Sequence, residues 1–594
     1  MSENQNSSRE QGMEKYFFRA SAEDFKNISG SPVAYWVSDA VRRAFRDCPR
    51  FEDVAPTRKG MVTARNEVYV RDWHEVSLSK NGLDKYPDRE SAKASGKKWF
   101  SYLKGGGYRK WYGNKFDVVN WENDGEDLQT TRHPSEDRVW ATNFNLDYIF
   151  KKNNSWGAVT SSDFSARYGN GGELFDAGGS GCFPKEVSHE SILGFLNAKV
   201  SGSMLKALNP TLNFQAGNIA NLPFLVSSDT EKTRSAVGRL ISVHRSDWNS
   251  YETSWDFTTL PLLHPDHRQA SLKASYQSLR THWREMTLEM QRLEEENNRI
   301  FIDAYGLQDE LTPDVPLNEI TLTCNPHYRY GGDKTEEELE ALLLADTMRE
   351  LVSYAVGCMF GRYSLDKPGL ILANQGDTLA DYLAQVPQPR FPADDDNVIP
   401  LLDGDWFPDD ITLRFRQFLR VAFGDAHYED NLTFIEQALN IKGKRTYSLR
   451  DYFLGEFYAD HVKRYKKRPI YWLFSSPKGT FSALVYLHRY RPDTVSVVLS
   501  YLRDFRKKLA SRLDYLQQVA INPSSSQSEK TKASKEADAI KKQLIELDDY
   551  ERDTLYPLAT EQVELDLDDG VKVNYLKLGA ALKKIVGLDA KGED

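Results

Sequence analysis

RQASLKASYQSLRTHWREMTLEMQRLEEENNRI, residues 268–300, is the clearest helical pattern in the sequence. Its apolar positions follow a 4-3-4-3-4-3 spacing, the a/d seam of three heptads, through Leu272, Tyr276, Leu279, Trp283, Met286, Met290 and Leu293. A continuous helix of this length reaches roughly 50 Å, at about 1.5 Å per residue. We expect either a strut between domains or a member of a helical bundle, and the pattern favours both equally.

The segment before this helix has a different pattern of residue types. Short β-prone runs at 67–70 and 116–119 alternate with glycine clusters at 105–107 and 178–181, which predicts a mixed, mostly β domain over 56–225. Closer to the start, apolar residues recur at helical spacing within 15–50, which predicts a linker helix.

Helices dominate the sequence beyond residue 334. We predict two antiparallel helices over residues 498–521 and 531–553, joined by the polar link at 522–526. The fold class is therefore α+β, with a mixed, mostly β domain, a long helical spacer and a mainly α-helical C-terminal domain. We place the boundaries at 1–55 (polar tail and linker helix), 56–225 (mostly β domain), 226–310 (helical spacer), 311–435 (mixed helical domain) and 436–594 (C-terminal helical domain).

Composition points to a cytoplasmic protein. Hydrophobic residues make up 40% of the 594 residues and charged residues 28%, and no apolar run reaches the roughly 18 residues of a membrane span. The first 14 residues are polar, unlike a signal peptide. Cys48, Cys182, Cys324 and Cys358 stand far apart, which indicates reduced structural thiols and argues against a zinc module.

The charge is unevenly distributed along the chain. The net charge of −10 speaks against a nucleic-acid partner, but residues 1–250 hold 34 Lys or Arg against 31 Asp or Glu. The acidic excess of −13 therefore lies in the rest of the chain. Consequently the N-terminal part can face phosphates without a global penalty.

The most informative stretch for function is KKWFSYLKGGGYRKWYGNK, residues 97–115, which interleaves aromatic, cationic and glycine residues. Cations meet phosphates, arginine reads guanine with two hydrogen bonds, and aromatic faces support a base or sugar. The alternative is a β-hairpin whose Trp and Tyr belong to the core while Lys and Arg coat the exposed face. The stretch by itself leaves both interpretations open, although at least one cation of 104–115 is expected to point out of the fold.

Two segments resemble catalytic motifs without matching them. Asn325-Pro326-His327-Tyr328 is similar to the N-P-P-Y loop of amino-methyltransferases, but its second proline is replaced and it follows a long helix, so we interpret it as a structural turn. The glycines at 178–181 lack the G-x-G-x-x-G spacing and a following helix, which favours a hairpin turn over a cofactor loop. The sequence yields no nucleophile elbow and no H-E-x-x-H motif.

Several phrases, in their order, resemble PglX/BrxX, the adenine-specific DNA methyltransferase family of BREX phage-defence systems. They include SGSPVAYWVS at 29–38, GMVT at 60–63, RDWHEV at 71–76, KWYGN at 110–114, FLNAK at 195–199, GRYSL at 361–365, KRPIYW at 467–472 and DDGVKVNY at 568–575. The similarity extends from about residue 24 to 576, nearly the whole chain.

The resemblance implies that 56–225 is a DNA target-recognition domain, and that the chain recognises double-stranded DNA for N6-adenine methylation performed elsewhere. The candidate DNA-binding residues are Thr63, Arg65, Arg71, Lys104, Arg109, Lys110, Tyr112, Asn114 and Lys115. Its partners would be double-stranded DNA, a methyltransferase domain in cis or trans, and other BREX components, with no membrane. The alternative is a protein-interaction scaffold of the defence complex, in which the acidic C-terminal half binds other components and DNA contact is incidental.

The chain departs from the family in one respect. Members carry a Rossmann-like domain with a glycine-rich S-adenosylmethionine loop and N-P-P-Y, and neither motif occurs here. We therefore expect a truncated, split or internally started gene product with no catalytic residues, no metal and no cofactor of its own. S-adenosylmethionine would belong to the separate catalytic domain.

Overall fold

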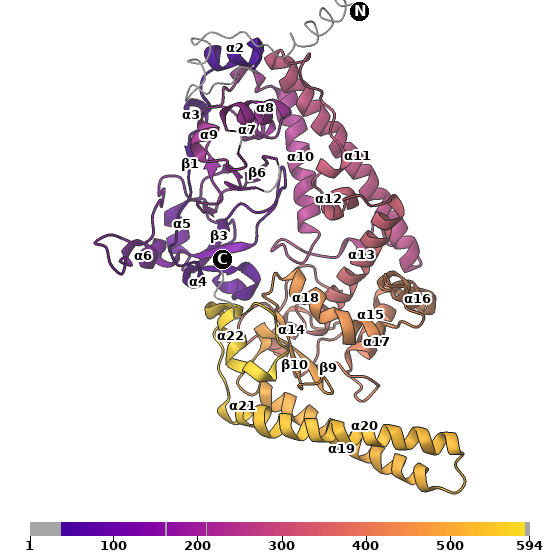
Figure 1. The fold of residues 1–594 in the computed structure, drawn as a ribbon. Helices are drawn as coiled ribbons and strands as arrows, with labels where there is room; N and C mark the ends of the chain where they lie inside the picture. The colour runs from indigo at the N-terminus through magenta and orange to yellow at the C-terminus, as the bar shows by residue number, and fades with distance from the viewer. Residues whose placement is uncertain (1–36, 161–162, 210, 589–594) are drawn as a thin grey trace, which may run out of the picture. The chain divides into compact units, whose positions relative to one another are not determined.

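The computed structural model describes residues 37–160, 163–209 and 211–588 (Figure 1). It contains 51% helix and 9% strand, which confirms the α+β class. Contacts divide the chain into two units, each assembled from three segments. The first unit comprises Met1–Arg65, Gly82–Trp248 and Arg284–Arg329, and the second comprises Asn66–Asn81, Asn249–Trp283 and Tyr330–Asp594. The five consecutive domains expected from the sequence stay a prediction.

The first unit holds the short strands. One antiparallel sheet has the order β1-β8-β5-β6, formed by Thr57–Arg58, Gly181–Cys182, Asn153–Trp156 and Ala166–Gly169. A second group centres on β3 (Trp99–Leu103), which pairs antiparallel with β4 (Asp117–Asn120) and parallel with β7 (Leu174–Phe175). All five residues of β3 are buried, so this strand is the hydrophobic centre of its sheet.

Helices surround these strands in the same unit. They are α2 (Asp39–Asp47), α3 (Phe51–Val54), α5 (Arg89–Ala94), α6 (Glu122–Thr130), α7 (His189–Leu196), α8 (Lys199–Leu208), α9 (Ala216–Ala220) and most of α10 (Glu231–Asn249). Side chains cap several of them in the usual way. The Ser188 hydroxyl, for example, accepts from the Ser191 N–H at the start of α7.

The heptad stretch forms α11 (Leu272–Tyr305), which confirms the predicted helix, although it begins four residues later than the predicted 268 and ends five residues beyond the predicted 300. Six of its seven seam residues are buried, and Met286 is half-buried. Residues up to Trp283 belong to the second unit and those from Arg284 onward to the first. The short helix α12 (Pro326–Tyr330) follows.

The second unit is mainly helical, as the sequence predicts beyond residue 334. Its helices are α4 (Asn66–Tyr69), α13 (Glu336–Met359), α14 (Leu379–Gln385), α15 (Ile411–Phe423), α16 (Tyr428–Leu439), α17 (Leu449–Tyr452), α18 (Tyr458–Arg464), α19 (Thr494–Ile521), α20 (Gln527–Tyr550), α21 (Tyr556–Glu561) and α22 (Gly570–Leu578). Its antiparallel sheet has the order β10-β11-β9, formed by Tyr471–Ser475, Ser482–Tyr486 and Val398–Pro400, and β2 (Val70–Asp72) also lies in this unit.

Helices α19 and α20 pack along each other as a hairpin, close to the predicted boundaries. A capping box begins α20, because Ser526 and Glu529 each accept the other's backbone N–H. Leu502, Leu509, Ala533 and Ile540 lie in the buried cluster of the hairpin. Among the described helices, none combines the length and the apolarity that crossing a membrane requires.

Two local predictions were wrong. Residues 66–69 form α4 rather than a strand, and the extended segment starts only at Val70, because β propensity depends on tertiary context. The glycines at 178–181 do not turn a hairpin, since β7 and β8 on either side belong to different sheets. The part of the expected 15–50 helix that precedes residue 37 lies outside the described residues, and α2 forms within the rest.

Candidate nucleic-acid interface

The stretch 97–115 forms β3 and the loop that leads toward β4. Trp99, Tyr102 and Trp111 are fully buried, which confirms that their rings belong to the core. The Trp111 indole N–H donates to Glu294 Oε1 at 2.8 Å. An aromatic residue that is both buried and hydrogen-bonded stabilises the fold, so these rings are not available to stack on a base.

Arg109 is buried in this loop, with 4% of its surface exposed. Its Nη2 donates to Asp247 Oδ2 at 2.8 Å, its Nη1 to Thr323 Oγ1 at 2.9 Å and its Nε to the backbone oxygen of Tyr112 at 2.9 Å. The guanidinium also lies 4.9 Å from the centroid of the Trp248 ring. Each nitrogen therefore has a partner inside the first unit.

Lys110 is equally buried, and its ammonium donates to the carboxylate of Glu294, which also accepts from Trp111. Burial by itself would lower the pKa of Lys110, but the adjacent Glu294 carboxylate more than offsets it and raises this pKa above its ordinary value. Lys110 is therefore a charged member of a buried ion pair at neutral pH.

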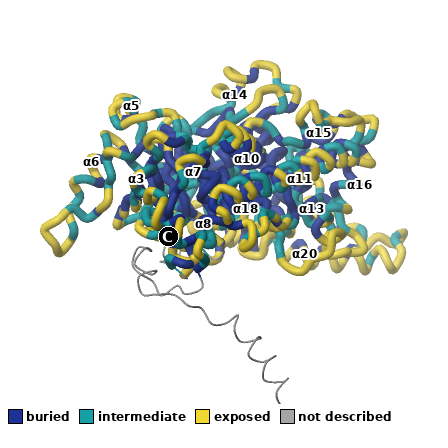
Figure 2. The backbone as a smooth tube through the Cα atoms, turned by 90° about the horizontal axis from the view of Figure 1, so that it is seen from above, coloured by how far each residue is buried: buried dark blue, intermediate teal, exposed yellow. Residues whose placement is uncertain are grey.

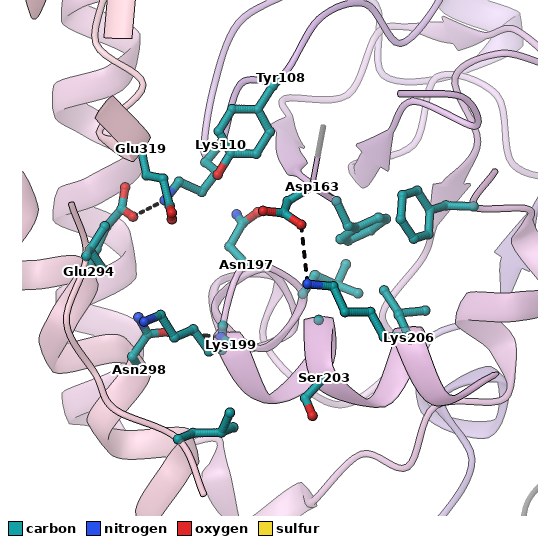
Figure 3. Close-up of a pocket in the computed structure, with 18 residues that line it drawn as sticks. Tyr108, Lys110, Asp163, Asn197, Lys199, Ser203, Lys206, Glu294, Asn298 and Glu319 are labelled. Carbon is teal, nitrogen blue, oxygen red and sulfur yellow. Dashed lines mark hydrogen bonds and ion pairs between the residues drawn. The ribbon is translucent and has the colours of Figure 1, made fainter. Parts of the chain in front are cut away.

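A cavity of about 370 Å³ lies beside this pair (Figure 3). Its lining includes Tyr108, Glu319, Lys199 and the pair Lys206–Asp163, whose charged atoms are 3.5 Å apart. Because Lys110 and Lys206 both face carboxylates, the cavity presents mixed charge. A mixed lining does not offer phosphate a concentrated positive surface.

Lys115 is the most enclosed of these cations. Its ammonium lies 2.6 Å from Asp84 Oδ2 and 2.7 Å from Glu173 Oε1, with only 2% of the residue exposed. Burial would lower the pKa of Lys115, and the two carboxylates raise it well above its ordinary value. This three-residue group fixes the end of the loop against the sheet.

Arg109, Lys110 and Lys115 are buried, so the expectation that at least one cation of 104–115 points out of the fold rests on Lys104 alone. The physical reason is that a buried charge needs a partner of opposite sign, and distant segments provide one for each. Lys104, at the end of β3, is partly exposed, with its ammonium 3.9 Å from Asp117 Oδ1. DNA contact by Arg109, Lys110 or Lys115 stays a prediction, and it would require breaking a buried ion pair.

The other predicted residues are scattered. Tyr112 is buried, and the guanidinium of Arg245 lies 4.8 Å from the centroid of its ring. Asn114 adopts a left-handed backbone (φ 57°), and its amide donates to the Gly107 oxygen at 2.8 Å. Arg71 belongs to the second unit, where its Nε donates to the backbone oxygen of Asp568 at 3.1 Å. These contacts support local structure.

The backbones around the two glycine clusters pack directly against each other. A Cβ on Gly179 would lie 2.1 Å from the Leu103 backbone oxygen, and one on Gly105 would lie 2.6 Å from the Gly178 oxygen. Glycine is required because the two backbones pack directly together. The segment at 178–181 therefore leaves no room for a nucleotide cofactor, and it does not fit S-adenosylmethionine.

The segment Asn325–Tyr328 does not fit the methylation chemistry either. The Asn325 amide donates to the backbone oxygens of Leu317 and Ile320, at 2.7 and 2.8 Å, and the Tyr328 hydroxyl donates to the Tyr108 oxygen at 2.5 Å. An N-P-P-Y loop needs its Asn free for the target amine, and here that amide already binds backbone. Both residues are therefore structural, as the sequence interpretation expected, although Pro326–Tyr330 forms the short helix α12 and not a turn.

Thr63 and Arg65 lie in a different setting, a pair of loops that we call the paired loops, residues 59–65 and 131–145. Val62 and Thr142 exchange two backbone hydrogen bonds of 3.0 Å, and the Asn145 amide donates to the Lys59 oxygen at 2.7 Å. Within the second loop, a bridge between Arg132 and Val139 forms a small hairpin. Hydrogen bonds therefore hold the paired loops in a defined conformation.

The surface of the paired loops is exposed and polar. Figure 2 shows a long exposed segment beside α6, and residues 134–138 are all exposed. The loops hold four Lys or Arg against two Asp or Glu. Arg138 forms an exposed pair with Glu136 at 2.5 Å, and the guanidinium of Arg65 lies 5.8 Å from the Trp140 ring centroid. Thr63 itself is buried beneath this surface.

The backbone of the paired loops is strained at Ala64. Ala64, Asn143 and Asn145 have φ values of 62°, 57° and 49°, in the left-handed region, which asparagine tolerates and alanine rarely adopts. Such residues persist only where the surroundings hold them, and they gather at binding sites. The sequence interpretation included Thr63 and Arg65 but missed the hairpin. Pro134-Ser135 between two cations was the available turn signal.

Together these features define an α+β protein with an exposed, cationic loop surface. Neither residues 178–181 nor residues 325–328 fit the binding of S-adenosylmethionine or of a target adenine. No family profile matches the chain. The chain is 37% identical over 581 residues to the adenine-specific methyltransferase BrxX of Escherichia coli O9:H4 (strain HS). It is 36% identical over 587 residues to the adenine-specific methyltransferase PglX of Lacticaseibacillus casei (strain Zhang).

These similarities cover 95% and 96% of the chain, and they confirm the resemblance to the PglX/BrxX family. The chain spans about half the length of the curated relatives it matches, 46% in each case.

Proposed function

We propose that this chain is the DNA-recognition part of a PglX/BrxX-type adenine methyltransferase, and that the paired loops contact duplex DNA. Arg65 and Arg138 would read base edges or phosphates, supported by Lys59 and Arg132. Methyl transfer and S-adenosylmethionine binding would belong to a separate catalytic domain, in cis or in trans.

The observation that carries the proposal is the paired loops themselves. They combine exposed arginines, a fixed hydrogen-bonded frame and strained backbone, in a chain similar to adenine-specific DNA methyltransferases. Exposed ion pairs such as Arg138–Glu136 are worth only about 0–1 kcal/mol, so a phosphate or guanine can displace the carboxylate. Arginine is also the side chain most suited to bidentate contact with guanine.

The exposure of the cations favours DNA contact at the paired loops over contact at 104–115. Arg109, Lys110 and Lys115 already have buried partners, whereas Lys59, Arg132 and Arg138 of the paired loops are exposed and Arg65 is half-buried. Thr63 and Arg65 belong to the proposed interface, in which buried Thr63 would support the loop that carries Arg65. Lys104 and Asn114 are proposed as marginal contacts at most.

The second candidate function is a protein-interaction scaffold of the defence complex. It is favoured by the acidic excess of −13 that follows residue 250, which suits a basic protein partner. The two functions differ in what they predict for free duplex DNA. A scaffold would bind it weakly or equally at every sequence.

Selection from a randomised duplex library with the full chain tests the proposal. We expect an enriched sequence, bound more tightly than a shuffled duplex in physiological salt. Arg65→Ala and Arg138→Ala should each remove about 1–3 kcal/mol of that preference. Arg46→Ala is the matched control, since Arg46 also forms an exposed pair, with Asp47 at 2.8 Å. No enrichment, or equal loss in the control, would contradict the proposal.

A further inference from the structure

The hairpin of α19 and α20 has an unusual charge for its part of the chain. We call its segment between residues 503 and 545 the arm. The arm holds ten Lys or Arg against five Asp or Glu, whereas the chain beyond residue 250 has a net charge of −13. The arm is therefore a basic element within an acidic region.

The arm exposes this charge because its apolar residues face inward. Leu509, Leu516, Ala533 and Ala537 are buried between the helices. The cations occupy the remaining positions, and Figure 2 shows α20 largely exposed. Packing of the hairpin thus leaves its polar faces to solvent.

Some of these cations are already paired. Arg512 binds Glu536 at 2.8 Å, and Lys541 lies 3.2 Å from Asp538. Lys530, Lys532, Lys535 and Lys542, in contrast, form no ion pair within the described residues. The last three are exposed. Lys532, Lys535 and Lys542 lie within about 80° of one another around the axis of α20, at about 100° per residue, and together form a surface that attracts a polyanion, while half-exposed Lys530 lies beside the buried face.

We propose that the arm binds the phosphate backbone of duplex DNA without regard to sequence. Lysine supplies point charges for phosphates, and the exposed hydroxyls of Ser528 and Ser534 on the same helix are further donors. The choice of duplex DNA as the polyanion rests on the proposed function. The arm adds affinity, and the paired loops supply preference.

An acidic protein is the competing occupant, and the surface fits it less well. Protein interfaces have an apolar core with aromatic anchors. The large apolar side chains exposed on the arm are Tyr515, Ile521 and Ile545, at 55%, 80% and 63% exposure, and they are spread over the two helices. Phosphate contacts need no such core.

The test is a full-chain variant that carries Lys530→Gln, Lys532→Gln, Lys535→Gln and Lys542→Gln. Binding is measured on several unrelated duplexes between 50 and 200 mM salt, with thermal unfolding as the folding control. We expect weaker binding on every duplex alike, and a salt slope smaller by about three, since each of the three phosphate contacts contributes about 0.9. The ratio between preferred and shuffled duplexes should not change.

Two further variants complete the design. Asp514→Asn removes an exposed acid of the arm and should tighten binding slightly on all duplexes, whereas Lys442→Gln, an exposed lysine outside the arm, should change nothing. An unchanged salt slope in the fourfold variant would overturn the proposal, as would a loss confined to the preferred sequence. If the paired loops do not contact DNA, no sequence preference will be seen, but the arm lysines will still change the salt slope. The two proposals can therefore fail separately.

Discussion

Two basic regions of the first unit use the same residue types for opposite purposes. In 104–115, Arg109, Lys110 and Lys115 are enclosed, and each meets a carboxylate from a distant segment. In the paired loops, Arg132 and Arg138 are exposed, and the carboxylates they face are exposed too. Burial of the acidic partner, and not the type of cation, therefore decides whether a basic stretch stabilises the fold or remains available to DNA.

The energies of the two regions differ accordingly. Removing one member of a buried pair leaves an uncompensated charge and costs about 3–5 kcal/mol. Removing one member of an exposed pair costs about 0–1 kcal/mol. Substitutions in 104–115 should therefore change the free energy of unfolding, and substitutions in the paired loops should change binding.

The largest effect is expected for Lys110→Met. It leaves the buried Glu294 carboxylate without its cation, so the free energy of unfolding should fall by about 3–5 kcal/mol in denaturant titration. The double variant Lys110→Met with Glu294→Gln is the control, and it should recover part of the loss because no bare charge remains. A loss below about 1 kcal/mol for Lys110→Met would show that the pair is not structural.

The second-largest effect is expected on acidification, which should lower the free energy of unfolding through the same region. Burial, followed by the charge of Arg109, lowers the pKa of His244 to about 3, and this ring lies 6.4 Å from that of Trp111. The unfolded chain takes up a proton below about pH 6.5 while the folded chain does not, so the contribution is present above pH 6.5 and is lost as the pH falls toward 3.

At pH 5 this amounts to about 2 kcal/mol. The measurement is the free energy of unfolding at pH 7 and pH 5 in the native chain and in His244→Leu, which lacks the titrating group. The variant should lose about 2 kcal/mol less than the native chain on acidification. Equal losses in both proteins would assign the acid sensitivity to other groups.

A smaller effect is expected for Arg132→Ala in the paired loops. Arg132 is exposed, and its pair with Asp137 spans 3.6 Å, so the free energy of unfolding should stay within about 0.5 kcal/mol. If Arg132 meets only phosphate, affinity should fall alike on all duplexes and the salt slope should drop by about one. A loss limited to one sequence would instead make Arg132 a base-reading residue.

The smallest effect is expected for Lys104→Ala. This residue is the partly exposed cation of 104–115, and its pair with Asp117 is long. Its removal should change the free energy of unfolding by about 0.5 kcal/mol or less. A loss comparable to that of Lys110→Met would remove the distinction between buried and exposed pairs on which the comparison rests.

Local periodicity made part of this fold predictable. The heptad seam of α11 and the two helices of the arm were predicted because their patterns repeat within one segment. The α+β class followed from the same patterns.

The burial of the cations was not predictable in this way. Lys110 and Glu294 are 184 positions apart, and Arg109 and Asp247 are 138 apart, so no local pattern records their pairing. The same holds for the paired loops, whose frame joins residues about 80 positions apart through Val62 and Thr142. Of the residues in the proposed site, the sequence interpretation included Thr63 and Arg65, whose DNA contact stays a prediction, and did not include the hairpin.

Amide hydrogen exchange of the full chain, with and without a selected duplex, shows which of the two regions contacts DNA. We expect the duplex to slow exchange in 59–65 and 131–145, while 104–115, already protected by burial, changes little. Protection confined to 104–115, with none in the paired loops, would contradict the account and return the DNA contact to the stretch where the sequence first placed it.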